Sequence, residues 1–214
     1  MGPQERRQRE REEIRTRILD AARELFVSEG YDAVTMRRIA DRIEYSPTAI
    51  YFHFKDKEAL MGELCAVDFY ALATQFTKIA RVEDPVERLR RIGQAYADFA
   101  VEFPNHYRLM FMTPHPPGDI PEEAQQRHGN PEEDAYAFLK SAIAQAIEEK
   151  RFRPEYTDPE LVSQTMWAGV HGVISLNIAK ECDPWVEWRP LKKRVSTMID
   201  VLVDGLMKPA KRSK

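Results

Sequence analysis

Short polar side chains gather at the start of one predicted helix, where they could contact a nucleic acid. Ser46 followed by Pro47 predicts a serine N-cap with proline at the first helical position, opening a helix of about eight residues. Small residues at a helix start allow close approach to base edges, and Thr48 can hydrogen-bond a base or contact a thymine methyl group. Ile50 and Phe54 are four residues apart, so both should face the core.

Longer polar groups follow on the same short helix and just after it. Tyr51, His53 and Lys57 have the length needed to reach phosphates, as do Arg37 and Arg38 in the preceding helix. An alternative stays open from spacing alone: Tyr51 and its neighbour Phe52 could pack on the next helix, leaving His53 merely solvated.

Catalytic and metal chemistry find little support in the sequence. His171 and Ser175 lie four residues apart, but no third orienting group, glycine-rich phosphate loop or paired-carboxylate motif accompanies them. Cys65 and Cys182 are far apart, and the histidines lack metal-ligand spacing. The sequence therefore predicts a protein that is not an enzyme, with no cofactor and no metal.

The charge balance does not by itself indicate a nucleic-acid partner. The chain has 214 residues, with 32 Lys+Arg against 35 Asp+Glu and a net charge of −3. Residues 1–60 hold 12 of each sign, so any DNA-binding signal must come from the placement of basic groups.

Only nine glycines and a wealth of good helix formers predict an all-α fold of about nine helices. Residues 1–13 are nearly all charged or polar and are expected to form a flexible arm, while Thr113–Pro131, rich in proline, is expected to be a loop. Helices are expected at the following ranges: 14–29, 36–43, 47–54, 56–80, 85–103, 104–112, 132–150, 158–181 and 188–207.

The first sixty residues fit the plan of a helix-turn-helix domain. Two short helices cannot bury much of themselves, and the apolar stripe from Ile14 to Phe26 supplies the third helix on which they pack. We therefore expect a DNA-binding domain over residues 14–60, with its motif at about 35–54.

The run from Thr35 to Leu60, TMRRIADRIEYSPTAIYFHFKDKEAL, resembles the N-terminal signature of the TetR family of bacterial transcriptional regulators. The preceding segments Ile18–Phe26 and Gly30-Tyr31 are similar to the family's first helix and its end. One departure stands out, since the family's turn usually has glycine where this chain has Glu44. If Glu44 takes a positive φ, the strain costs roughly 1 kcal/mol.

The resemblance implies DNA contacts at a set of residues in and around the motif, with Lys57 as the phosphate anchor. The set is Thr35, Arg37, Pro47, Thr48, Ala49, Tyr51, Phe52, His53 and Lys57. If base reading lies elsewhere, the arginine-rich residues 6–11 could act as a minor-groove arm.

Residues 61–208 are expected to form a helical domain for ligand binding and dimerisation. Two fragments, Pro104–Phe111 and Trp167–Gly172, resemble a TetR subset with a Trp…His-Gly motif. Because the family usually encloses an apolar cavity in this domain, we expect a pocket lined by Phe99, Phe103, Tyr107, Met110, Phe111, Met166, Trp167, Val170, His171 and Ile174.

Spacing pairs Phe103 with Tyr107 and Trp167 with His171, and the two pairs are expected to face one another across this pocket. His171 would supply its orienting hydrogen bond. The alternative is a hydrogen-bonded core histidine, and the sequence leaves both open.

Two helices carry stripes that suit a four-helix interface between two copies of the chain. The residues expected there are Gly169, Gly172, Leu176, Leu191, Val195, Met198, Leu202 and Leu206. A homodimer agrees with the resemblance to the TetR family and with a DNA operator made of two half-sites.

The sequence thus predicts a cytoplasmic homodimeric repressor that binds a pseudo-palindromic double-stranded DNA operator and is released by a small, largely apolar ligand. A ligand-responsive activator and a ligand-binding helical protein without DNA binding remain alternatives. The uncharged stretch Leu161–Ala179 is too polar for a bilayer, so no membrane association is expected.

Overall fold

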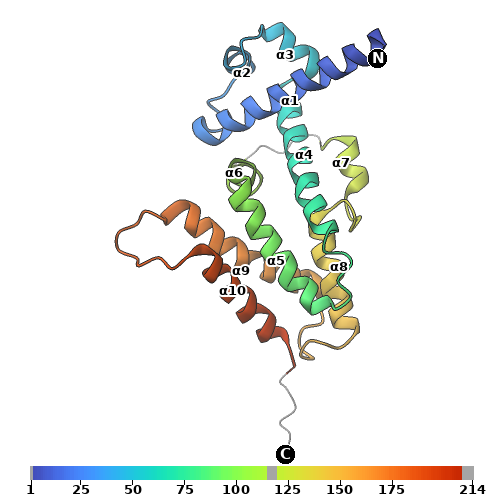
Figure 1. Cartoon of the computed structure of the whole chain (residues 1–214), viewed down its shortest axis with the longest axis vertical. Helices are drawn as coiled ribbons and strands as arrows, with labels where there is room; N and C mark the ends of the chain where they lie inside the picture. Colours follow the sequence, from blue (N-terminus) through green and yellow to red (C-terminus); the bar gives the residue numbers. More distant parts are fainter. Residues whose placement is uncertain (1, 115–119, 209–214) are drawn as a thin grey trace, which may run out of the picture. The chain divides into compact units, whose positions relative to one another are not determined.

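The computed structural model of the protein describes residues 2–114 and 120–208. Within them the fold is all-α, as predicted, and Figure 1 shows the order of the helices. The helices are α1 (Pro3–Glu29), α2 (Met36–Arg42), α3 (Pro47–His53), α4 (Lys57–Thr77), α5 (Pro85–Glu102), α6 (Pro104–Met112), α7 (Glu122–Arg127), α8 (Ala135–Glu148), α9 (Pro159–Lys180) and α10 (Leu191–Leu206).

Local sequence signals set most of these boundaries. The side chains of Thr35 and Ser46 accept hydrogen bonds from the backbone N–H groups of Arg38 and Ala49, so both predicted N-caps are confirmed. Gly30 ends α1 with a φ of +85°, a conformation that glycine adopts without strain.

The expectation of a frayed N-terminal arm is wrong, because residues 3–13 form the first turns of α1. Pro3 occupies the first helical turn, and the Glu5 carboxylate accepts a hydrogen bond of 2.8 Å from the Gly2 N–H. Ion pairs four residues apart, Arg6–Glu10 and Arg9–Glu13, add support along the exposed helix surface.

The expected loop 113–131 also needs correction, since it contains the short helix α7. The carbonyl of Pro121 accepts backbone hydrogen bonds from Ala124 and Gln125, which starts the helix, and two glutamates occupy its first turn. Ten helices are therefore present in the described residues instead of about nine, and residues 115–119 of the expected loop lie outside them.

The chain divides into two compact units that differ from the expected boundary after residue 60. The first unit comprises Met1–Phe69 with Phe103–Gln126, and the second comprises Tyr70–Glu102 with Arg127–Lys214. The division falls inside α4, so this helix contributes to both units.

The first unit has its own apolar core, with Ile18, Ile39 and Ile50 fully buried between α1, α2 and α3. A buried ion pair joins α1 to α4: Arg23 Nε and Nη2 donate to the two carboxylate oxygens of Asp68 at 3.0 and 2.7 Å. Both side chains are almost fully inaccessible, so each charge depends on the other.

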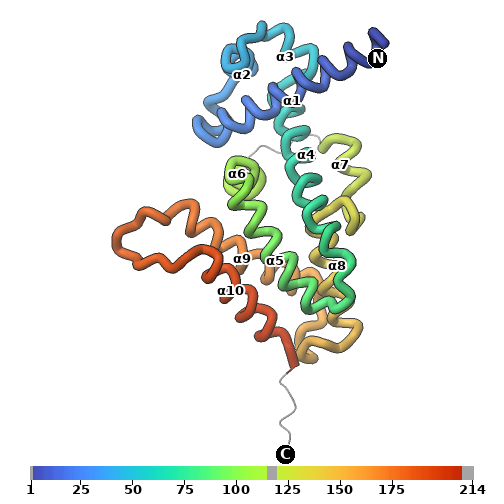
Figure 2. Tube along the Cα trace, viewed as in Figure 1, coloured from blue at the N-terminus to red at the C-terminus, as the bar shows by residue number. Residues whose placement is uncertain are grey.

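The second unit packs α5, α8, α9 and α10 against one another. Gly169 of α9 lies so close to Leu202 of α10 that a Cβ there would be 2.6 Å from Leu202 Cδ1. Figure 2 shows the long connection between α9 and α10 extending away from these two helices. No helix among the described residues is long and apolar enough to cross a membrane.

Candidate DNA-binding surface and ligand site

The helix-turn-helix motif is held by its buried face. Ile39 and Ala40 of α2 and Ile50 of α3 are inaccessible, and Phe54 directly after α3 is also buried, as the four-residue spacing predicted. Glu44 in the turn has a φ of +61°, so the conformation suspected from the sequence is present. The Tyr45 N–H donates to the Ala40 carbonyl at 3.0 Å, which closes the turn.

The outer face of α3 is open, with Thr48 exposed and Pro47 and Ala49 half-buried. Tyr51 is 54% exposed and Phe52 is 72% exposed, so neither packs under the next helix. This contradicts the alternative in which the two aromatic rings belong to the core. Exposed aromatic rings on a short helix are available to a partner.

His53 lies at the end of α3 and is half-buried, with its Nδ1 buried and lacking a hydrogen-bond partner among the described residues. Burial lowers the pKa of His53 below its ordinary value, and the charges of Arg11 and Arg15 lower it further. The neutral ring is therefore favoured in the free protein.

The expected contacts at α2 fall on its exposed N-terminal turn. Thr35 is exposed but uses its hydroxyl oxygen to accept the Arg38 N–H at 3.1 Å. Arg37 is exposed, whereas the guanidinium of Arg38 is 2.9 Å from the Glu29 carboxylate. Arg37 is thus the arginine of this turn that is better placed for a phosphate.

Lys57 has a role within the fold that the sequence did not reveal. Its Nζ donates hydrogen bonds to the carbonyls of Tyr31 and Val34 at 2.8 and 3.0 Å. It also lies 4.1 Å from the centre of the Tyr31 ring. An ammonium group has three donors, so the two carbonyls do not use all of them.

A polar cluster in the second unit contains His171. The Tyr96 hydroxyl is 3.3 Å from His171 Nδ1, and Trp167 Nε1 donates to the same hydroxyl at 3.0 Å. Burial lowers the pKa of His171. Tyr96 was missed at the sequence level, although it lies three residues before Phe99 and on the same face of α5.

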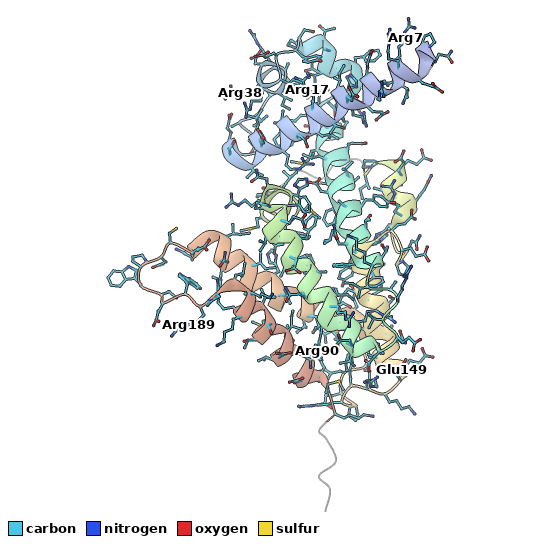
Figure 3. All side chains as sticks on the ribbon, in the orientation of Figure 1. Arg7, Arg17, Arg38, Arg90, Glu149 and Arg189 are labelled. Carbon is cyan, nitrogen blue, oxygen red and sulfur yellow. The ribbon has the colours of Figure 1, made fainter. Side chains whose placement is uncertain are left out.

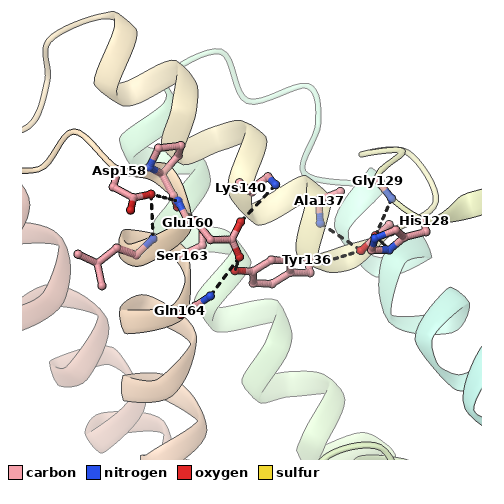
Figure 4. A network of polar contacts seen from close by, with 12 residues as sticks. His128, Gly129, Tyr136, Ala137, Lys140, Asp158, Glu160, Ser163 and Gln164 are labelled. Atoms are coloured by element: carbon pink, nitrogen blue, oxygen red, sulfur yellow. Dashed lines mark hydrogen bonds and ion pairs between the residues drawn. The ribbon is translucent and has the colours of Figure 1, made fainter. Parts of the chain in front are cut away.

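Tyr136 of α8 extends this cluster, and it too was missed. Its ring centre is 6.1 Å from that of Trp167, and its hydroxyl donates to Glu160 at 2.5 Å. Figure 4 shows Glu160 between Tyr136, Lys140 and Gln164. Burial and the hydrogen bond to this carboxylate raise the pKa of Tyr136 to about 12.

The residues expected to line a pocket are mostly inaccessible. Trp167 is 39% exposed, while Phe103, Phe111 and His171 are half-buried. The rest are buried: Phe99, Tyr107, Met110, Met166, Val170 and Ile174. Phe103 and Tyr107 belong to the first unit and Trp167 and His171 to the second, so the facing of the two pairs stays a prediction.

A shallow hollow of about 320 Å³ lies elsewhere, where α9 ends and the chain turns toward α10. Its lining includes Cys182 and Trp185 and none of the expected pocket residues. No group of three or more His, Cys, Asp or Glu side chains suited to a metal gathers in residues 2–114 and 120–208, and His115 lies outside these ranges.

Part of the expected dimer interface is buried inside the second unit. Val195 and Leu206 are 1% and 8% exposed, because this stripe of α10 packs on α5 and α9 of the same chain. Gly169 likewise faces Leu202 of its own chain. The assignments of Val195 and Leu206 to the interface are therefore corrected, while Gly169, Leu191, Met198 and Leu202 are half-buried and stay predictions.

An outward apolar stripe remains on α9 and includes Leu161 and Leu176, which are 61% and 53% exposed. Gly172 lies between them with open space at its Cβ position. On α10 the outward apolar residue is Val201, at 63% exposure. Helical spacing alone did not decide which apolar residues of α10 face outward.

Family models match both parts of the chain. Residues 18–64 match the model described as bacterial regulatory proteins, tetR family, and residues 89–202 match a tetracyclin repressor-like C-terminal domain. The second match alone spans more than half of the chain, and it includes α9 with His171.

Individual relatives agree with these models. The chain is 36% identical over 95 residues to the HTH-type transcriptional regulator UidR of Escherichia coli, covering 44% of this chain and 43% of UidR, so less than half of that relative is spanned. It is 44% identical over 64 residues to the HTH-type transcriptional repressor Rv1474c of Mycobacterium tuberculosis, covering 30% of each.

One solved structure illustrates the shared fold. FadR from Bacillus subtilis, solved in complex with stearoyl-CoA, superposes with a TM-score of 0.71 at 17% identity. The superposition covers 89% of this chain and 98% of that one.

Proposed function

Because the chain belongs to the TetR family of bacterial regulatory proteins, we propose that it is a homodimeric transcriptional repressor that binds a pseudo-palindromic operator and is released by a largely apolar small molecule. The observation that carries the proposal is the exposed outer face of α3. Thr48, Tyr51 and Phe52 are accessible there, while Ile50 fixes the helix on the core. A two-turn helix presented in this way fits the major groove.

The proposal assigns base reading to the start of α3 and phosphate contacts to its surroundings. Thr48 and Ala49 lie at the N-terminal turn, which is the part of a recognition helix that reaches base edges. Arg37 and Lys57 contact the backbone, together with Thr35, Pro47, Tyr51, Phe52 and His53.

A dimer follows from the outward stripe of α9 and the outward side of α10. Leu161, Leu176 and Val201 would be covered by the same residues of a second copy, in an interface with two-fold symmetry. Two copies also place two reading helices on successive major grooves. A DNA-binding protein of this kind acts in the cytoplasm.

The ligand is proposed to contact the aromatic cluster of the second unit. Tyr96, Tyr136 and Trp167 offer apolar ring surface, and His171 supplies a polar group whose neutral form is favoured by burial. The solved complex of FadR with stearoyl-CoA supports testing a long acyl chain as the apolar ligand.

The proposal is tested by a gel shift with the DNA upstream of the protein's own gene. We expect a retarded complex containing two copies of the protein. Adding stearoyl-CoA should abolish this complex, at concentrations that leave the stability of the Thr48→Trp variant unchanged. From a random DNA library, the Thr48→Trp variant should select a preferred sequence that differs from that of the wild-type protein. Its melting temperature should be unaltered. Absence of binding to any DNA would contradict the proposal. Tighter binding of the protein to its operator with ligand, in a reporter strain, would indicate activation instead.

The role of His171 is separated from a purely structural one by His171→Phe. We expect this variant to keep its dimer and its operator affinity while release by ligand weakens by about 1–3 kcal/mol, the usual cost of leaving a buried polar partner unsatisfied. A core histidine would instead lower the melting temperature and the operator affinity together. Wild-type release in the variant would contradict the assignment of the ligand site.

A further inference from the structure

The first eleven residues of α1 form a helical extension that lacks a core of its own. Residues 3–13, called here the α1 extension, are all exposed, and burial begins only at Ile14. Figure 1 shows this end of α1 continuing past α3, within the first unit. The position of its charges therefore decides what the extension can do.

The register of α1 places two arginines on the face that points toward the helix-turn-helix. Ile14 and Ile18 face the core, and stepping back by three and four residues along the same face leads to Arg11 and Arg7. In the extension, Arg7 and Arg11 therefore occupy the face that apolar residues occupy in the rest of α1. Figure 3 labels Arg7 at the free end of α1.

Contacts with α3 confirm which way this face points. The guanidinium carbon of Arg11 lies 5.3 Å from the centre of the exposed Phe52 ring. One turn further on, Arg15 donates to the His53 carbonyl at 3.3 Å and lies over the Phe54 ring. The arginine face therefore adjoins the end of the recognition helix.

The remaining arginines of the extension are paired with carboxylates of the same helix. Arg6 is 3.5 Å from Glu10 and Arg9 is 3.8 Å from Glu13. No described carboxylate forms such a pair with Arg7 or Arg11. The lowered pKa of His53, caused in part by Arg11 and Arg15, is consistent with a positive potential on this side.

We propose that Arg7 and Arg11 form a second phosphate-binding surface, which contacts the DNA backbone flanking the bases read by α3. The inference rests on the proposed function and extends it to the part of the chain before the helix-turn-helix. Guanidinium groups match phosphate oxygens in geometry, and such contacts add affinity without reading sequence.

The observed helix argues against a minor-groove arm made of residues 6–11. A helix with side chains is about 10–12 Å wide, whereas the minor groove of B-DNA is about 6 Å wide. An extension of eleven residues spans roughly 16 Å, or at most about five base pairs of flanking DNA.

The test compares two double variants that each remove two positive charges, Arg7→Gln/Arg11→Gln and Arg6→Gln/Arg9→Gln. Affinity is measured against salt concentration on two DNA fragments. One is a long upstream fragment, and the other lacks the five base pairs that flank the bases read by α3 on each side. Each lost phosphate contact lowers the slope of log K against log salt by about 0.9, so four contacts per dimer lower it by about 3.6. We expect that loss for the first variant on the long fragment only, and little change for the second variant.

Circular dichroism checks that both variants keep the helix. An equal fall of the slope in the two variants would show general electrostatic attraction and overturn the proposal, as would an unchanged slope in the first variant. If the wild-type protein binds no DNA at all, the proposed function itself fails, so the two failures are distinguishable.

Discussion

Lys57 has a role in the fold in addition to the phosphate contact that we propose for it. Its bonds to the carbonyls of Tyr31 and Val34 join the start of α4 to the segment between α1 and α2. A phosphate bound by the remaining donor would therefore rest on a fixed ammonium group. This coupling changes what a substitution at Lys57 is expected to do.

Lys57→Ala is expected to lower both stability and DNA affinity. Losing hydrogen bonds to a charged donor costs about 1.5–3 kcal/mol in unfolding free energy. The loss of one phosphate contact in each half-site should weaken all DNA sequences equally and reduce the salt slope by about 0.9 per contact. Urea unfolding and salt titrations measure the two effects, and Lys55→Ala, in an exposed neighbour, is the control. A stability loss with an unchanged salt slope would limit Lys57 to a structural role.

Glu44 is strained at its φ of +61°, which a residue without a Cβ would adopt freely. Glu44→Gly should raise the unfolding free energy by about 0.5–1 kcal/mol, because the relief of strain exceeds the added entropy of the unfolded chain. Glu44→Ala removes the carboxylate but keeps the Cβ, so it should gain nothing of this kind. Equal stabilities of the two variants would show that the turn is not strained.

The packing of α9 on α10 depends on one glycine and not on its neighbour. A Cβ at Gly169 would lie 2.6 Å from Leu202, whereas the Cβ position of Gly172 is open. Both glycines lie on α9 within one turn of each other, so their helix propensities are matched.

Gly169→Ala should therefore be less stable than Gly172→Ala by about 1 kcal/mol, the lower end of the overpacking range, because the end of the Leu202 side chain can move aside, and Leu202→Ala as a second change should remove the difference. Gly172→Ala should be neutral or stabilising by up to about 1 kcal/mol, because alanine is the better helix former. Thermal or urea unfolding compares the variants. If the two single variants behave alike, the close approach of α9 and α10 is not rigid.

In the molecule as a whole, half-buried histidines contribute to the dependence of stability on pH. Burial lowers the pKa of His53, His106 and His171 below the value of about 6.5 that they have when unfolded. Between the lowered and the ordinary pKa the unfolded chain binds more protons, so stability rises with pH there. Unfolding free energy should fall as pH drops below about 6.5, and His171→Gln should reduce the dependence. A wild-type slope in that variant would contradict the role of His171.

The proposed dimer is also a property of the whole molecule. Leu176→Glu should separate the copies and weaken operator binding at least tenfold, because the charge would be buried in the proposed interface. Val101→Glu places the same charge on α5, at a residue that is 63% exposed, and should change neither property. Light scattering and gel shifts check both variants, and a dimeric Leu176→Glu protein would place the interface elsewhere.

The sequence alone determined the helices other than α7, the caps at Thr35 and Ser46, and the helix-turn-helix with its buried Ile50. These features depend on hydrogen bonds and side-chain periodicity within one or two turns, which neighbouring residues specify. The helical start at Pro3 was in principle readable from the same signals, since Glu5 and the spaced ion pairs are local.

Only the tertiary structure decided how helices distant in sequence meet. It placed Tyr96 beside His171, Lys57 on the carbonyls before α2, and Val195 inside the second unit while Val201 remained outside. An amphipathic helix can be rotated by a small angle without changing its pattern, so the stripe that is buried depends on the shape of the partner helices. Contacts between residues far apart in the chain are fixed by that packing, which no local sequence signal encodes.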